Sequence, residues 1–245
     1  MKDNILNINN LSKSYNTRDG EIKAIDNISL SVKEGDFIAI VGTSGCGKSS
    51  LLNILAGLDK DFEGTFKFRE NTEISYMLQT DCLFDFLTIF DNCKLGLDIK
   101  KKKNYSYINE LLKLYNLEDF KYKKPSSLSG GMRQRVALIR TLALKPDVLL
   151  LDEPFSALDY QTRVSISNDV YNMIKKENKT AIIVTHDISE ALSLANKIVV
   201  LSKRPCSIKK IYDIDLGNNP IERRKSTEFN KLHELIWKDL DINVK

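Results

Sequence analysis

The chain has 245 residues, 42% of them hydrophobic and 29% charged, which is an ordinary composition for a soluble globular protein. Its 37 Lys and Arg residues against 33 Asp and Glu residues leave a net charge that neither indicates nucleic-acid binding nor excludes an anionic ligand. No apolar run approaches the roughly 18 residues that cross a bilayer, and the N-terminal residues lack a signal-peptide pattern, so we expect a cytoplasmic protein. The four cysteines form no CxxC pair, which is typical of reduced thiols.

The first half of the chain contains the patterns of two strands and a helix. Residues 28–32 alternate apolar and polar side chains, as in a half-buried strand. Residues 37–41 are all apolar and stop at Gly42, which is typical of a buried strand that enters a glycine turn. A helix is predicted over residues 48–56, and Gly57 closes it.

The turn between this strand and this helix matches the phosphate-loop pattern G-x-x-x-x-G-K-[ST]. Glycines let the backbone bend so that consecutive N–H groups face phosphate oxygens, and the helix N-terminus adds the positive end of a dipole. Lys48 is expected to reach the β- and γ-phosphates, and the Ser49 hydroxyl to bind Mg²⁺. The predicted nucleotide-binding residues of this loop are Gly42, Thr43, Ser44, Gly45, Cys46, Gly47, Lys48, Ser49 and Ser50.

Cys46 is an unusual residue inside this loop. The charge of Lys48 and the dipole of the helix both favour the thiolate, which predicts a thiol that reacts with a maleimide in the empty protein. The alternative is that the side chain turns into the core behind the loop and stays inert.

A phosphate loop occurs in GTPases and kinases as well as in ATPases. Residues 61–64 imitate the GTPase motif D-x-x-G, but they lie only a dozen residues beyond Ser49. No N-K-x-D or T-K-x-D motif for guanine follows. The sequence therefore disfavours a GTPase.

The remaining strand patterns predict the fold class. Buried strands are expected at residues 148–151, 181–184 and 198–201, separated by helix-length segments, which indicates an α/β core with a parallel sheet. Residues from about 81 to 145 carry helical patterns, and we interpret them as a helical subdomain inserted into that core. The whole chain is predicted to be one nucleotide-binding domain, with residues from about 206 to 245 as a C-terminal extension.

Two acidic residues follow the apolar strand at residues 148–151. A carboxylate at the C-terminal end of a parallel strand faces the ligand crevice of such a sheet, so Asp152 is expected to hold Mg²⁺ directly or through water. Glu153 is the natural group to orient or deprotonate an attacking water. Adjacent acids at a strand end are also common on surfaces, but the nearby phosphate loop favours the functional interpretation.

Residues 128–135 read LSGGMRQR and resemble the signature sequence of the ABC ATPase family. In that family the signature presents a serine hydroxyl, glycine N–H groups and a helix N-terminus to the γ-phosphate, which here implies Ser129, Gly130 and Gly131. Ser129 is also a suitable N-cap for a helix that runs through Arg140, and both roles can hold together.

Other segments resemble further motifs of this family in the same order along the chain. Gln79 resembles the glutamine that contacts Mg²⁺ and water and senses the permease. Asp159 lies in a segment similar to the loop that crosses the dimer interface. His186 resembles the histidine that contacts the γ-phosphate, and Tyr15 the aromatic residue that stacks on adenine. A buried core role is the alternative for Tyr15.

The resemblance implies an assembly as well as a fold. It implies an ABC ATPase core with a small antiparallel β subdomain, which binds ATP and Mg²⁺. Two chains are expected to sandwich two ATP molecules head to tail, so that Ser129 of one chain completes the Lys48 site of the other. Integral membrane permease subunits and, indirectly, an extracytoplasmic solute-binding protein are the implied partners, with the ATPase on the inner face of the membrane.

Residues 79–92 and 201–205 are similar to those of the ATPases that power import of nitrate, sulfonates, taurine and related small solutes. Asp85 and Phe86 stand where that branch often has Pro-Trp, and Cys206 where it has Gly. The identity of the solute is not encoded in this chain.

The C-terminal segment has an amphipathic helical pattern. Phe229, Leu232, Ile236 and Leu240 lie on one helical face, which we expect to dock on the core. The alternative is a face that binds a partner.

Two other functions are weighed against a transport ATPase. A translation-factor or repair type of ABC protein, which acts on nucleic acid, usually duplicates the cassette or inserts a long coiled coil, and neither pattern occurs here. We therefore expect no nucleic-acid partner. A purely regulatory ATP-binding module is disfavoured by the intact Glu153 and His186.

Overall fold

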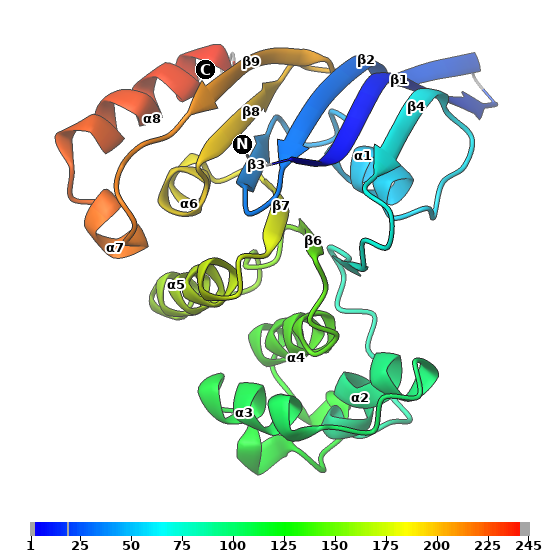
Figure 1. Cartoon of the computed structure of the whole chain (residues 1–245), viewed down its shortest axis with the longest axis vertical. Helices are drawn as coiled ribbons and strands as arrows, with labels where there is room; N and C mark the ends of the chain where they lie inside the picture. The colour runs from blue at the N-terminus through cyan, green and yellow to red at the C-terminus, as the bar shows by residue number, and fades with distance from the viewer. Residues whose placement is uncertain (1–2, 19, 241–245) are drawn as a thin grey trace.

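The computed structural model describes residues 3–18 and 20–240, and these form two sheets with helices packed against them (Figure 1). The larger sheet has the strand order β5-β6-β7-β3-β8-β9 and is parallel except for the antiparallel pair of β8 and β9. Its strands are β3 (Phe37–Val41), β5 (Ile74–Met77), β6 (Val148–Asp152), β7 (Thr180–Thr185), β8 (Lys197–Leu201) and β9 (Ile208–Asp213).

The smaller sheet is antiparallel, with the order β2-β1-β4. The strands β1 (Asn4–Thr17) and β2 (Gly20–Lys33) pair along most of their length, and β4 (Glu63–Phe68) pairs with the other edge of β1. The alternation at residues 28–32 predicts the last part of β2. The sequence pattern did not predict β1. In that strand the polar residues Asn9 and Asn10 interrupt the apolar alternation at the point where the pairing with β2 is irregular.

Helix α1 follows β3 directly, and α2, α3 and α4 lie between β5 and β6 in the sequence, at the bottom of Figure 1. Helices α5 and α6 precede β7 and β8, and α7 and α8 follow β9. Two short 3₁₀ segments precede α4. The bounds are α1 (Lys48–Leu55), α2 (Ile89–Ile99), α3 (Ser106–Leu114), α4 (Gly130–Leu142), α5 (Tyr160–Lys176), α6 (Ile188–Leu194), α7 (Pro220–Arg223), α8 (Thr227–Asp239), η1 (Glu118–Phe120) and η2 (Pro125–Ser127).

Both faces of the larger sheet are covered, which explains its continuously apolar strands. In β3, Phe37 and Ala39 belong to a core shared with α2 to α6 and α8. Ile38 and Ile40 belong to a second core shared with α1 and the antiparallel sheet. Successive side chains of a strand point to opposite faces, so a strand covered on both sides is apolar at every position.

The predicted elements of the α/β core are confirmed. The apolar runs at residues 148–151, 181–184 and 198–201 are β6, β7 and β8; β6 is parallel to β7, and β7 and β8 are both parallel to β3. The predicted helix at residues 48–56 is α1, and Gly57 follows its C-cap with a φ of +74°. A positive φ of this size is the usual way in which glycine ends a helix.

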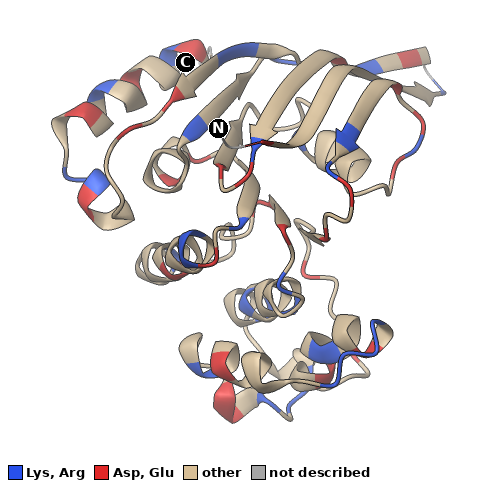
Figure 2. Cartoon of the chain, in the orientation of Figure 1, with Lys and Arg blue, Asp and Glu red and all other residues tan. Residues whose placement is uncertain are grey.

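Charged residues of both signs are interspersed over the elements of the molecule (Figure 2). The lysine run after α2 is exposed, and Lys100 and Lys102 pair with Glu73 at 3.1 and 3.6 Å. In the part of the chain that the structure describes, no helix is both long enough and apolar enough to span a membrane.

Candidate nucleotide site

The phosphate loop connects β3 to α1 and is shaped around Lys48. The ammonium group of Lys48 is buried and donates to the carbonyl oxygens of Gly42 and Thr43, both at 2.9 Å. Gly47 has a φ of +132°, and a Cβ atom there would lie 2.8 Å from the carbonyl oxygen of Ala24. The backbone of this position is therefore accessible to glycine alone, as the phosphate-loop pattern requires.

A cavity of about 440 Å³ opens over this loop. This volume is within the usual range of small-molecule sites, roughly 300–1,000 Å³. Loop residues Ser44 to Ser50 line it together with Tyr15, Gln79 and Glu153, although Cys46 is not among them. The fold therefore brings four sequence-distant predicted segments to one cavity.

Tyr15 stands at the rim of this cavity. The residue is 38% exposed, and its hydroxyl lies within hydrogen-bond distance of Ser50 Oγ, at 3.1 Å, and of Asp59 Oδ2, at 3.3 Å. The Lys13 ammonium lies 4.7 Å from the centre of its ring. Tyr15 is therefore not a buried core residue, and it lines the cavity.

Asp152 ends β6 beside the phosphate loop and is almost completely buried, with 2% exposure. Burial raises the pKa of its carboxyl group, and the adjacent Ser49 hydroxyl opposes that rise. Within the described residues, its Oδ1 atom has no hydrogen-bond partner. A buried carboxylate oxygen without a partner, next to a serine hydroxyl, fits the oxygen ligands that Mg²⁺ prefers.

The three predicted catalytic residues meet at the carboxylate of Glu153. The Gln79 amide donates to Glu153 Oε2 at 3.4 Å, and His186 Nδ1 lies 3.2 Å from Glu153 Oε1. These residues follow β5, β6 and β7, which are neighbours in the sheet, so their C-terminal ends meet at one edge. Glu153 also has a φ of +46°, a conformation that is unusual for a residue other than glycine and that is concentrated at functional sites.

The signature residues lie outside this cavity. Ser129 caps α4 by accepting a hydrogen bond from the Met132 N–H at 3.3 Å, as predicted. Ser129 and Gly130 are exposed, and Gly131 is half-buried. Asp159 caps α5 and likewise does not line the cavity. A single chain thus does not bring its own signature to its own phosphate loop.

The expectation of an accessible Cys46 thiol is wrong. Its side chain is 2% exposed and belongs to the core between β1, β2 and α1. Its N–H donates to the Thr43 carbonyl at 3.3 Å, so the loop itself uses this group. The buried Cys46 sulfur lies 4.0 Å from the Lys48 ammonium, and among the four cysteines only Cys82 is exposed.

Arg204 is a cavity residue that the motifs do not predict. It follows β8, and its guanidinium donates twice to the carbonyl of Gly45, at 3.1 and 2.6 Å. The sequence marks it only as part of the similarity at residues 201–205. Its contact with the loop depends on the pairing of β8 with β3, which no local pattern contains.

Comparisons with known proteins identify the family of the chain. The sequence pattern of the ABC transporter family matches residues 25–156. The chain is 40% identical to an uncharacterized ABC transporter ATP-binding protein, YtlC, of Bacillus subtilis, over 96% of this chain and 95% of the relative. It is 38% identical to the aliphatic sulfonates import ATP-binding protein SsuB of Bacillus cereus, over 91% and 90%.

A solved structure has the same fold. The dimeric post-hydrolysis state of the ATP-binding cassette MJ0796, bound to ADP and Pi, matches with a TM-score of 0.77 and 32% identity, over 86% of this chain and 99% of that one. The chain is a member of the ABC transporter family and has the fold of its ATP-binding cassette.

Proposed function

We propose that this protein hydrolyses ATP to power the import of a small solute, such as a sulfonate, taurine, nitrate or a related compound, through a separate permease. The observation that carries the proposal is the carboxylate of Glu153, held between Gln79 and His186 at the wall of the phosphate-loop cavity. A regulatory module that only binds ATP does not need such an arrangement.

Nucleotide binding relies on groups that are already in position. Lys48 exchanges its hydrogen bonds to the loop carbonyls for the β- and γ-phosphates, and the N-terminus of α1 adds its dipole. Ser49 and Asp152, with Gln79 nearby, would hold Mg²⁺, which neutralises charge on the phosphate oxygens. Tyr15 offers an aromatic face to the adenine.

Glu153 is the group that acts on water. Its carboxylate accepts a hydrogen bond from the attacking water and takes up the proton as the oxygen approaches the γ-phosphorus. Gln79 and His186 fix the orientation of the Glu153 carboxylate, because each of them contacts a different one of its two oxygens. His186 is mostly exposed, which leaves it free to contact the γ-phosphate as well.

The signature supports a dimeric assembly. Ser129 and Gly130 are exposed at the start of α4 and away from their own cavity, so a second chain can receive them. The similar cassette MJ0796 is dimeric in its state with ADP and Pi. We infer a head-to-tail homodimer in which Ser129, Gly131 and the segment around Asp159 face the partner's nucleotide.

The transport assignment rests on the relatives. A relative that covers most of the chain is named for aliphatic sulfonate import, which supports permease partners and, indirectly, an extracytoplasmic solute-binding protein. The protein would then act on the inner face of the membrane. Basic and acidic residues are interspersed along the helices and strands (Figure 2), which supports partners other than nucleic acid.

The experiment that tests hydrolysis is Glu153→Gln. The amide keeps the size and hydrogen bonding of the side chain but cannot accept the proton, so kcat should fall by roughly 10²-fold or more while ATP still binds. ATP should also trap the variant as a dimer on gel filtration. Glu110→Gln, an exposed residue of α3, is the matched control. Hydrolysis by Glu153→Gln at the rate of the control would assign the base to another residue.

A further inference from the structure

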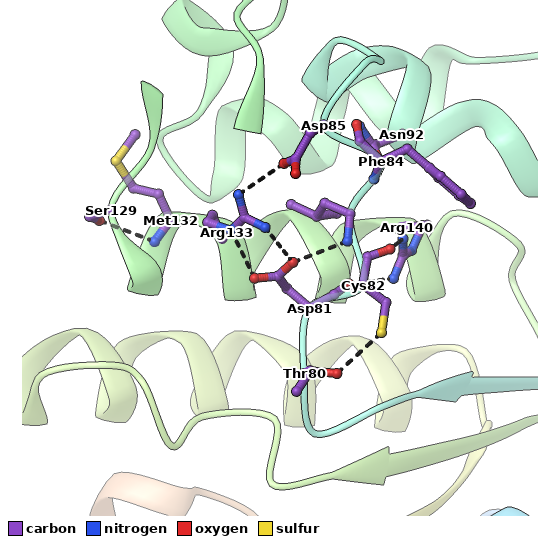
Figure 3. A network of polar contacts seen from close by, with 11 residues as sticks. Thr80, Asp81, Cys82, Phe84, Asp85, Asn92, Ser129, Met132, Arg133 and Arg140 are labelled. Atoms are coloured by element: carbon purple, nitrogen blue, oxygen red, sulfur yellow. Dashed lines mark hydrogen bonds and ion pairs between the residues drawn. The ribbon is translucent and has the colours of Figure 1, made fainter. Parts of the chain in front are cut away.

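The segment that follows Gln79 is joined to α4 by an arginine–carboxylate fork. Arg133 donates from Nε to Asp81 Oδ2 and from Nη2 to Asp81 Oδ1, both at 2.9 Å (Figure 3). Both side chains are about three-quarters buried, with 26% and 25% exposure. A bidentate pair fixes the orientation of its partners as well as their separation.

Further contacts hold the same segment, which we call the Gln79 segment (residues 79–85), along α4. Arg140, about two helical turns beyond Arg133, donates to the backbone carbonyls of Asp81 and Cys82 at 2.6 and 2.7 Å. Arg133 also reaches Asp85 at 3.4 Å. Figure 3 shows these groups spread along α4, with Ser129 at one end, Arg133 and Asp81 in the middle and Arg140 at the other end.

Gln134, the residue after Arg133 in α4, makes hydrogen bonds to the segment that begins at Glu153. The Gln134 amide donates to the carbonyl of Glu153 at 3.1 Å and to Ser156 Oγ at 3.2 Å, and its oxygen accepts from the Ala157 N–H at 2.9 Å. Gln134 is buried. The first turns of α4 are therefore fixed to the chain after Gln79 and to the chain after Glu153.

These contacts connect two parts of the site that lie far apart in the sequence. The N-terminus of α4 carries Ser129, and the orientation of its first turns sets where that hydroxyl points. Gln79 contacts Glu153, and Asp81, two residues further along the chain, forms an ion pair with Arg133. Asp81 and Arg133 therefore join the segment that carries Gln79 to the helix that begins beside Ser129.

We propose that Asp81 and Arg133 are positioning residues, whose ion pair couples the seating of Gln79 against Glu153 to the orientation of Ser129. This inference rests on the proposed action of Ser129 on the partner's nucleotide. Neither residue touches the phosphate-loop cavity, so the pair acts through Gln79 and Ser129.

The test measures kcat, the affinity of the monomer for ATP, and the Tm of matched variants. Asp81→Asn and Arg133→Gln should each lower kcat about fivefold or more, with monomer affinity for ATP within about twofold of wild type, because coupled contacts of this kind are worth such factors. The double variant should be no slower than either single variant, since each alone already breaks the link. Arg133→Lys keeps the charge but loses the fork, so it should behave as Arg133→Gln does.

The matched control is the ion pair of Arg69 with Glu34. It is also bidentate, at 2.8 and 3.0 Å, but it lies at the antiparallel sheet and away from the cavity. Glu34→Gln should leave kcat within about twofold of wild type. Equal losses of kcat in Asp81→Asn and Glu34→Gln would overturn the inference, as would a loss in Asp81→Asn that disappears once the assay is cooled to compensate for a lower Tm.

A spectroscopic readout separates coupling from simple stabilisation. Cys82 is the exposed cysteine among the four and lies within the Gln79 segment, so a fluorescent maleimide placed there reports on that segment. Ser129→Arg should change how much the fluorescence of the label responds to ATP. When Arg133→Gln is also present, Ser129→Arg should no longer change that fluorescence response. An influence that persists unchanged in Arg133→Gln would overturn the inference.

Failure of the proposed function would give a different result. If Ser129→Arg hydrolysed ATP at the wild-type rate, the role of the signature would be wrong whatever the Asp81 variants did. If Ser129→Arg were inactive while Asp81→Asn kept the wild-type kcat, the signature would hold and only the coupling would fail.

Discussion

At the scale of single residues, packing decides which groups are available for chemistry. Cys46 and Lys48 are two positions apart, yet the loop presents Lys48 to the cavity and turns Cys46 into the core. The reactivity of a thiol depends on its access to solvent as well as on nearby positive charge. The loop pattern predicted the positive charge near Cys46, but it did not predict whether solvent reaches the thiol.

This difference predicts the order of cysteine labelling. A maleimide should label Cys82 first, and Cys46, Cys93 and Cys206 slowly, because these three thiols are buried. Burial also raises the pKa of Cys93 and Cys206 to about 12, which removes their thiolates at neutral pH. Peptide mapping by mass spectrometry checks the order, with Cys82→Ser as the control. Rapid labelling of Cys46 would show that the loop opens further than this structure does.

Glu190 predicts a pH dependence of stability. It is buried in the first turn of α6, and burial raises the pKa of its carboxyl group from 4.5 to about 8; Asp187 adds to the rise, and Arg163 and Arg224 oppose it. Below pH 4.5 the group is protonated in the folded and unfolded states alike. Between pH 4.5 and about 8 only the folded state keeps the proton, so its contribution to the free energy of unfolding falls as the pH rises.

Glu190→Gln should remove this contribution. The free energy of unfolding of the variant, relative to wild type, should increase from pH 4.5 to about 8 and then level off. Urea unfolding at several pH values within this window measures the difference. Glu118→Gln, an exposed residue of η1, should show no such trend. A constant difference between Glu190→Gln and wild type would mean that Glu190 is ionised in the folded protein.

At the scale of elements, the structure shows which face of the amphipathic C-terminal helix α8 packs on the core. The expected docking of its apolar face is confirmed, since Phe229, Ile236 and Leu240 are buried in the main core and Leu232 packs against it. The adjacent Leu235 and Trp237 are partly exposed, at 46% and 39%. The same helix therefore has one docked face and one face in contact with solvent.

The docking of α8 predicts a stability difference between neighbouring residues. Ile236→Ala should lower the free energy of unfolding by about 2–5 kcal/mol, because it leaves a cavity in the core. Leu235→Ala, one position earlier and 46% exposed, should change it by less than about 1 kcal/mol. Urea titration of both variants checks this. Equal effects at the two positions would mean that α8 is not docked in solution.

At the scale of the whole molecule, the two proposed halves of the nucleotide site lie at different places on the chain. The Lys48 half has a formed cavity in one chain, whereas the Ser129 half is exposed and lies elsewhere. Such a division is expected when a symmetric dimer builds each site from two different surfaces.

This division predicts that two loss-of-function variants differ in binding. Lys48→Ala should weaken the binding of ATP to the monomer, because the ammonium group that reaches the phosphates is removed. Ser129→Arg should leave that binding close to wild type while it abolishes hydrolysis. Titration with a fluorescent ATP analogue under dilute conditions measures the affinities, and Ser126→Arg on the exposed turn before the signature is a control for the added charge. A similar loss of monomer binding in both variants would contradict the assembly in trans.

The sequence alone determined the fold class and the positions of the motifs along the chain. Glycines at fixed spacing, the adjacent acids Asp152 and Glu153, and the capped turn at Ser129 act through their immediate neighbours along the chain, so their patterns were sufficient to predict them. The apolar runs likewise predicted β3, β6, β7 and β8, because a strand buried on both faces has no polar position.

Only the tertiary structure decided which distant segments meet. Arg204 contacts Gly45 because β8 pairs with β3, and Asp81 contacts Arg133 because α4 packs beside the chain that leaves β5. The burial of Cys46 was decided in the same way, by the antiparallel sheet that covers the loop. Contacts of this kind depend on how layers pack against one another, and that packing is not contained in the periodicity of any single segment.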